Sequence, residues 1–169
     1  MADDPSTRHY GGIRRGMVAA AALLAWDIGL SGSFLMSLLV CPIWFLVTLV
    51  GSAIRRPGWR LALLRLAIPA LTLAIVKVNN AQQLKRAEDK ALQVVAACEK
   101  YHTVNGKYPE TLGDLVPEHM PSVPQAKRCL LWGHFVYFNQ GKPMLVWYVV
   151  PPHYRKIYDF HDRRWSFLD

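Results

Sequence analysis

Apolar residues are continuous in the first 78 positions of the chain and become periodic after them. Three apolar segments, 16–30, 34–54 and 61–78, are long enough to consider as membrane spans. As helices, the second and third are about 31 and 27 Å long, enough to cross a bilayer. The first is about 22 Å long and could cross a thinned bilayer or lie partly in the interface.

Basic residues beside these segments indicate their orientation. Arg14-Arg15 precedes the first segment, and a basic cluster at 55–60 precedes the third. The positive-inside rule places both in the cytoplasm, which requires two crossings between them. We therefore predict three spans, a cytoplasmic tail at 1–15 and an exported domain at 79–169. A two-span arrangement is the alternative, and it leaves one basic cluster on the wrong side.

Two charges lie within the apolar segments. Asp27 falls about 18 Å of helix beyond Arg15, near the outer end of its segment, and Arg65 lies only about 7 Å past Arg60. Their depths differ by about 10 Å, which is too much for a good ion pair. We interpret them as two interfacial charges, with an ion or proton relay as the alternative.

A helical pattern begins where the third span ends. No Pro or Gly occurs between 79 and 83, so the helix is expected to continue from the membrane to about Val104. Asn105-Gly106 predicts its end, because glycine readily supplies a left-handed cap. Its apolar positions follow the spacing of one amphipathic stripe, namely Leu84, Ala87, Ala91, Val94, Val95, Cys98 and Tyr101.

Strand patterns fill the rest of the chain. Thr111 and Asp114 have the spacing of a capped helical turn within 109–116. Aromatic and β-branched runs then predict a meander of three or four antiparallel strands packed on the helix, at 130–138, 144–150, 156–160 and 165–168. The predicted fold is an α+β membrane protein with three N-terminal helices.

Several motifs in this part of the chain resemble the pseudopilins and minor pilins of type II secretion and type IV pilus systems. They are Ala97-Cys98-Glu99-Lys100-Tyr101, Asn105-Gly106-Lys107-Tyr108-Pro109 and Leu115-Val116-Pro117. The resemblance covers 61–169 and implies a pilin-like domain on the periplasmic side of a bacterial inner membrane. The family's processing signal, a glycine followed by Phe-Thr-Leu-Ile-Glu, is absent, as is its acidic calcium loop, so filament assembly is not implied.

Composition excludes several classes of function. The net charge is +8, and residues 1–78 hold eight basic side chains against three acidic ones, beside the apolar segments. This distribution indicates membrane orientation rather than nucleic-acid binding. The six histidines lack metal-ligand spacing, and no phosphate-binding, dinucleotide or nucleophile-elbow motif occurs. We predict no enzyme activity, cofactor, metal or small-molecule substrate, with a membrane enzyme as a remote alternative.

Cysteine placement leaves two interpretations. Cys41 lies in the second span and is read as a core thiol. Cys98 is on the helical stripe, and Cys129 begins the first predicted strand. An exported domain would permit a disulfide between them if strand and stripe meet, and two buried free thiols are the alternative.

Aromatic residues in the strands point to a binding surface. In the runs 130–138 and 144–150, both the odd-numbered and the even-numbered positions are apolar. The strands of a half-exposed sheet alternate between apolar and polar residues instead. Either a partner meets one face, or the proline-rich 117–128 segment and the C-terminus cover it. Aromatic and arginine side chains dominate binding hot spots, and the candidates here are Trp132, Phe135, Tyr137, Trp147, Tyr148, Tyr154, Arg155, Arg163 and Trp165.

These observations predict a non-catalytic protein, anchored in the inner membrane, whose periplasmic domain binds a partner protein. It would act as an assembly or accessory factor. Two alternatives have the same architecture. One is an immunity protein that neutralises a toxin acting in the periplasm, and the other is an accessory subunit of a larger membrane complex.

Overall fold

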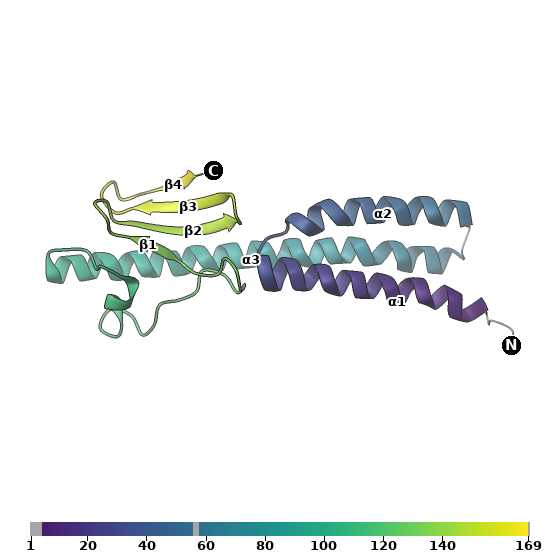
Figure 1. Ribbon diagram of the computed structural model, residues 1–169, viewed down its shortest axis with the longest axis horizontal. Helices are drawn as coiled ribbons and strands as arrows, with labels where there is room; N and C mark the ends of the chain where they lie inside the picture. Colours follow the sequence, from purple (N-terminus) through teal and green to yellow (C-terminus); the bar gives the residue numbers. More distant parts are fainter. Residues whose placement is uncertain (1–4, 56–57, 169) are drawn as a thin grey trace. The chain divides into compact units, whose positions relative to one another are not determined.

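The computed structural model describes residues 5–55 and 58–168 and consists of two compact units. Unit 1 is Met1–Asn80 and unit 2 is Ala81–Asp169 (Figure 1). The predicted boundary between anchor and domain, at 78/79, lies two residues before this division.

Unit 1 is helical. α1 (Pro5–Leu24) continues into a π-helical segment, η1 (Ala25–Ser31), which ends at Gly32 with a left-handed φ of 60°. α2 (Leu35–Arg55) follows. The first helix therefore begins well before residue 16, because the polar N-terminal residues join it.

Among the described residues, two helices are long and apolar enough to cross a membrane. They are Leu35–Ile54 in α2 and α3 (Trp59–Asn105). α1 does not meet this criterion, since each of its 18-residue windows contains three arginines. The coarse prediction of apolar helices before an α+β domain is confirmed, whereas their insertion in a membrane and a third span stay predictions.

α3 is one helix of 47 residues that continues past Val78 without a break. In unit 2 its buried stripe includes Ala87, Ala91 and Cys98, all with 0% exposure. Their spacing places them on one face, as the sequence predicted. Gly106, with a φ of 70°, follows the last helical residue and confirms the predicted cap.

A short 3-10 helix, η2 (Leu112–Leu115), confirms the predicted helical turn. The Asp114 carboxylate accepts hydrogen bonds from the backbone amides of Glu110 and Thr111, each at 2.9 Å. These bonds hold the turn so that both of its leucines enter the core.

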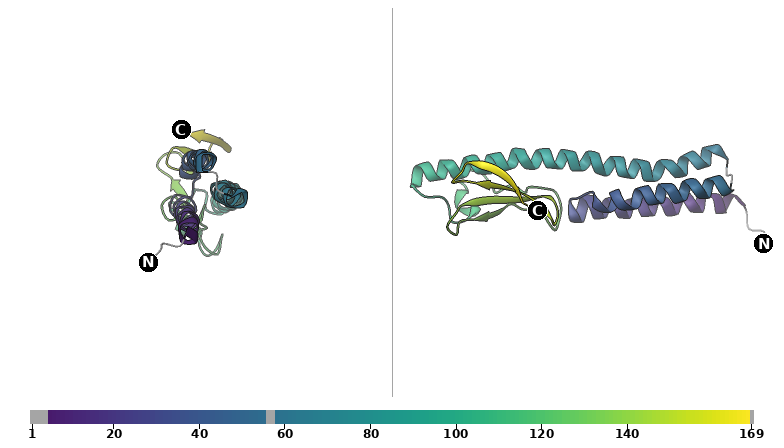
Figure 2. Two further views of the ribbon diagram at one scale, coloured as in Figure 1. Left: turned by 90° about the vertical axis from the view of Figure 1, so that its right-hand side faces the viewer. Right: turned by 90° about the horizontal axis from the view of Figure 1, so that it is seen from above.

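The sheet contains β1 (Val136–Phe138), β2 (Met144–Val150), β3 (Tyr154–Asp159) and β4 (Arg164–Leu168). All neighbours are antiparallel and follow chain order, so the predicted meander is confirmed with four strands. α3 packs against one face of the sheet (Figures 1 and 2).

The first predicted strand, 130–138, was too long, because only Val136–Phe138 pairs. The Lys127 amide donates to the Gly133 carbonyl at 3.1 Å, which closes a loop. Within it, a Cβ at Gly133 would lie 2.5 Å from the Cys129 carbonyl oxygen. This tight loop carries the chain around a corner before β1 begins, and the apolar composition of 130–135 does not reveal it.

Candidate functional site

The face of the sheet turned away from α3 is the main candidate surface. Strand register places Val136, Val146 and Ile157 in one row across it, and Tyr148, Arg155 and Leu168 in another. Alternate residues Leu145 and Trp147 point the other way, into the core with α3. We call this surface the outer face, and it consists of Val136, Phe138, Met144, Val146, Tyr148, Arg155, Ile157 and Leu168.

The outer face is mainly apolar and partly open, with three of its eight residues exposed, four half-buried and one buried. Val136 is 37% exposed, Phe138 49% and Leu168 46%. Val146, between Val136 and Ile157 in its row, is only 6% exposed. In Figures 1 and 2 no described element of unit 2 lies over this face. An apolar surface of this kind is typical of protein contact sites.

A three-residue cluster occupies one corner of the outer face. The rings of Trp132 and Tyr148 are 4.7 Å apart, and the Arg155 guanidinium lies 5.9 Å from the centre of the Tyr148 ring. The Arg155 Nε is buried and has no hydrogen-bond acceptor among the described residues. This corner therefore combines aromatic surface with a half-buried cation.

The other predicted partner-binding residues lie elsewhere. Phe135 and Trp147 are buried in the core, and Tyr137 and Trp165 pack against it from the side that faces α3. The sequence could not distinguish these core-facing residues from Trp132 and Tyr148, because the strands are apolar on both of their faces.

Two predicted rim residues lie beside the helix-facing side of the sheet. Tyr154 stacks on Phe167, with ring centres 5.2 Å apart. Arg163, in the turn between β3 and β4, lies 3.7 Å from the carboxylate of Glu99 on α3. Neither joins the outer face. Val136, Phe138 and Leu168 were not among the predicted residues. They lie on the same face of the sheet as Tyr148, and the strand register that places them there comes from the structure.

The proline-rich 117–128 segment does not cover the outer face. Met120 and Ala126 are buried in the core beside α3, and Lys90 on α3 donates to the Gln125 carbonyl at 2.7 Å. The C-terminal residues form β4 itself. The alternative in which these two parts cover the sheet is therefore wrong for the described residues.

The two charges of the apolar segments lie apart within unit 1. Asp27 is fully buried, and its carboxylate accepts the Ser37 amide at 2.7 Å, at the N-terminus of α2. The Arg65 guanidinium lies beside Gly12 on α1, about 22 Å of helix before Asp27. They form no direct pair with each other, as predicted. Asp27 is a buried helix cap rather than the interfacial charge that was expected.

The three cysteines are free thiols, and the structure does not bring Cys98 and Cys129 together. The amide of Arg128, next to Cys129, donates to the Gln83 side chain at 3.2 Å. Gln83 is about 22 Å along α3 from Cys98, far beyond the reach of a disulfide. Burial raises the pKa of the Cys98 thiol to about 12, and the nearby Glu99 carboxylate adds to this effect.

No group of three or more potential metal ligands occurs among the described side chains. Burial is the main cause of the raised pKa values of Tyr108, Tyr137 and Tyr158, which all lie in or beside the core.

Comparisons with protein-family models, with curated proteins and with solved structures produced no match for this chain. The resemblance to pseudopilins therefore stays a prediction.

Proposed function

We propose that this chain is a non-catalytic membrane protein that uses the outer face of unit 2 to bind a partner protein. In this proposal three helices cross the bacterial inner membrane, the N-terminus is cytoplasmic, and the pilin-like unit 2 lies in the periplasm. The basic residues beside the apolar segments support the orientation. The long helix packed on an antiparallel meander is consistent with the pilin-like assignment.

The observation that carries the proposal is the uncovered apolar outer face. α3 covers one side of the sheet, whereas Val136, Phe138 and Leu168 are open on the other. Leaving these side chains in water forgoes the free energy gained when apolar surface is buried. A partner that covers them recovers that free energy.

The chemistry of the partner follows from the Trp132–Tyr148–Arg155 corner. Aromatic residues and arginine are the side chains on which protein binding most often depends. Arg155 places a cation beside these rings, 5.9 Å from the centre of the Tyr148 ring. We therefore expect the partner to present an apolar patch with a carboxylate at its edge.

A matched pair of substitutions tests this surface. Phe138 in β1 lies on the outer face, whereas Phe167 in β4 lies on the helix-facing side of the sheet. Their side chains are similarly exposed, at 49% and 55%. A photo-reactive residue at 138 in the full chain would identify the partner in the membrane. The affinity of that purified partner would then be measured for the unmodified chain, Phe138→Ser and Phe167→Ser.

We expect Phe138→Ser to weaken binding about tenfold or more, as for a hot-spot residue, and Phe167→Ser to leave it unchanged. Equal effects of the two substitutions, or no purified partner that binds, would refute the outer face as the binding site. The partner's identity separates the narrower forms of the proposal, since a toxin would indicate an immunity protein and membrane subunits would indicate an accessory role.

A further inference from the structure

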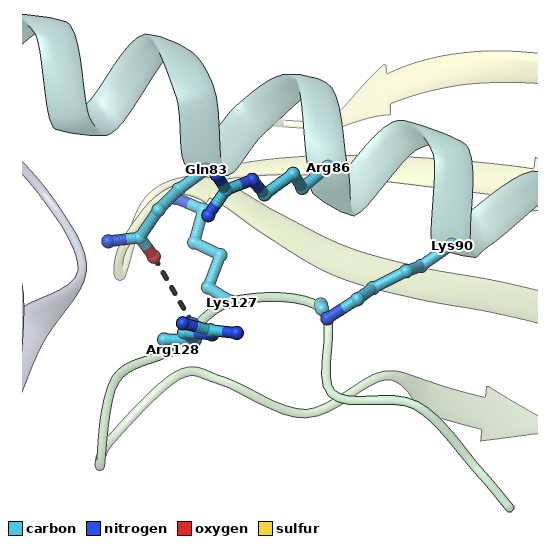
Figure 3. Close-up of a pocket in the computed structure, with 6 residues that line it drawn as sticks. Gln83, Arg86, Lys90, Lys127 and Arg128 are labelled. Atoms are coloured by element: carbon cyan, nitrogen blue, oxygen red, sulfur yellow. Dashed lines mark hydrogen bonds between the residues drawn. The ribbon is translucent and has the colours of Figure 1, made fainter.

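A basic hollow in unit 2 lies away from the outer face. It has a volume of about 250 Å³ and is formed between about two turns of α3 and the 126–128 segment (Figure 3). Its lining residues are Gln83, Arg86, Lys90, Ala126, Lys127 and Arg128. We call this site the basic hollow.

Cations dominate the basic hollow, and none of its six described lining residues is acidic. The guanidinium groups of Arg86 and Arg128 make no ion pair or hydrogen bond with the described residues. Lys90 donates one hydrogen bond to a carbonyl, at 2.7 Å, which leaves its charge uncompensated by a carboxylate. Glu88, on the same helix, is engaged elsewhere, with Lys156 at 2.6 Å.

Two hydrogen bonds between side chains and backbone groups hold the 126–128 segment in place. The Gln83 side chain is buried and accepts the Arg128 amide at 3.2 Å, which ties the 126–128 segment to α3. Lys127 is buried, and its ammonium donates to the Val149 carbonyl at 2.6 Å, which ties the same segment to β2. The 126–128 segment is therefore fixed beside α3, and an anion in the hollow would meet cations from both.

We propose that the basic hollow binds a phosphate group, with Arg86 and Arg128 as the main donors and Lys90 as a further cation. Guanidinium groups match phosphate oxygens in paired hydrogen bonds. The volume is below the range of about 300–1,000 Å³ that is usual for sites of organic ligands, so a small ion or a head group fits better.

Two sources of phosphate are compatible with this chemistry. One is free phosphate, and the other is an anionic lipid head group. Arg86 is eight residues after Val78 on the unbroken α3, about 12 Å along the helix, and the head-group layer is about 5–7 Å thick. A long side chain bridges such a difference. The lipid source rests on the proposed membrane anchor, whereas binding of free phosphate does not.

The experiment uses the full chain and two probes. In an uncharged detergent, inorganic phosphate is titrated and followed by calorimetry at constant ionic strength. In nanodiscs, the thermal unfolding midpoint is compared between phosphatidylcholine alone and phosphatidylcholine with phosphatidylglycerol. The test variant is Arg86→Gln/Arg128→Gln, and Lys107→Gln/Lys142→Gln removes the same charge from exposed turns elsewhere.

We expect one of two supporting results. Phosphate binds in detergent and Arg86→Gln/Arg128→Gln weakens it by about tenfold or more, because charge-assisted hydrogen bonds are lost. Alternatively, only phosphatidylglycerol stabilises the protein, and the test variant alone loses this stabilisation. Arg86→Lys/Arg128→Lys keeps the charge without the paired donors and should restore part of the effect.

The proposal is overturned if neither probe acts on the unmodified chain, or if the test and control variants lose equal amounts. Near-ultraviolet circular dichroism verifies that each variant is folded, and folding is expected because both arginines are exposed. The basic hollow shares no residue with the outer face. Affinity for the partner protein, measured on the same variants, therefore tests the outer face independently of phosphate binding.

Discussion

Two phenylalanines test whether the sheet is covered on one face only. Phe160 is 1% exposed, and its ring lies 5.1 Å from that of Tyr108 and 5.0 Å from that of Tyr158. Phe138 is 49% exposed on the outer face. Replacing each with alanine removes the same atoms, so the difference between the two variants reports on burial alone.

The expected magnitudes differ severalfold. Phe160→Ala should cost about 3–5 kcal/mol, the usual range for a buried phenylalanine. Phe138→Ala should cost about 1 kcal/mol, since about half of the benefit of burying the side chain is at stake. For a domain of this size the first value lowers the unfolding midpoint by on the order of 20 °C and the second by roughly 5 °C.

The assay is thermal unfolding of the full chain in detergent, followed by near-ultraviolet circular dichroism. Equal shifts for the two variants, or a larger shift for Phe138→Ala, would refute the reasoning, because the outer face would then be covered in the folded protein. Leu145→Ala, at a fully buried helix-facing position, is a positive control and should resemble Phe160→Ala.

Three further predictions concern unit 1 and the loop before β1. Asp27→Ala should lower the stability of the full chain in detergent by about 1–2 kcal/mol, because a buried cap of α2 is lost, and an unchanged unfolding midpoint would contradict this role. Burial lowers the pKa of Lys127 to about 8, from 10.5. The unfolded chain therefore binds more protons at Lys127 between these values, so stability should rise from pH 8 to 9 in denaturant titrations, above which the raised pKa of Cys98 acts in the opposite direction. That rise should disappear in Lys127→Met. Finally, a thiol reagent at pH 8 should label Cys129 in the folded protein and spare Cys98, whose pKa is about 12, as mass spectrometry of the labelled chain would show.

Local patterns were sufficient for most of the elements. The stripe of small apolar residues from Ala87 to Cys98 defined the buried face of α3, since only one face of a helix can meet a sheet. Gly106 defined its end, and the prolines after Val150 defined the end of β2. These features depend on the nearest few residues, which is why the sequence alone contains them.

Only the tertiary structure decided which residues face a partner. Trp147 and Tyr148 are neighbours with similar chemistry, yet one is in the core and the other on the outer face. A strand that is apolar at both parities carries no signal about which side will meet the helix, so packing makes the choice.

Contacts distant in sequence were likewise beyond local reasoning. The closed loop at 127–133 moved Cys129 away from Cys98, and it brought Arg128 beside Arg86, 42 positions earlier. Sequence by itself determined the helices, the meander and the apolar segments, because these follow from periodicity. The structure alone decided the open face of the sheet and the basic hollow, because both depend on how the 117–135 segment folds back along α3.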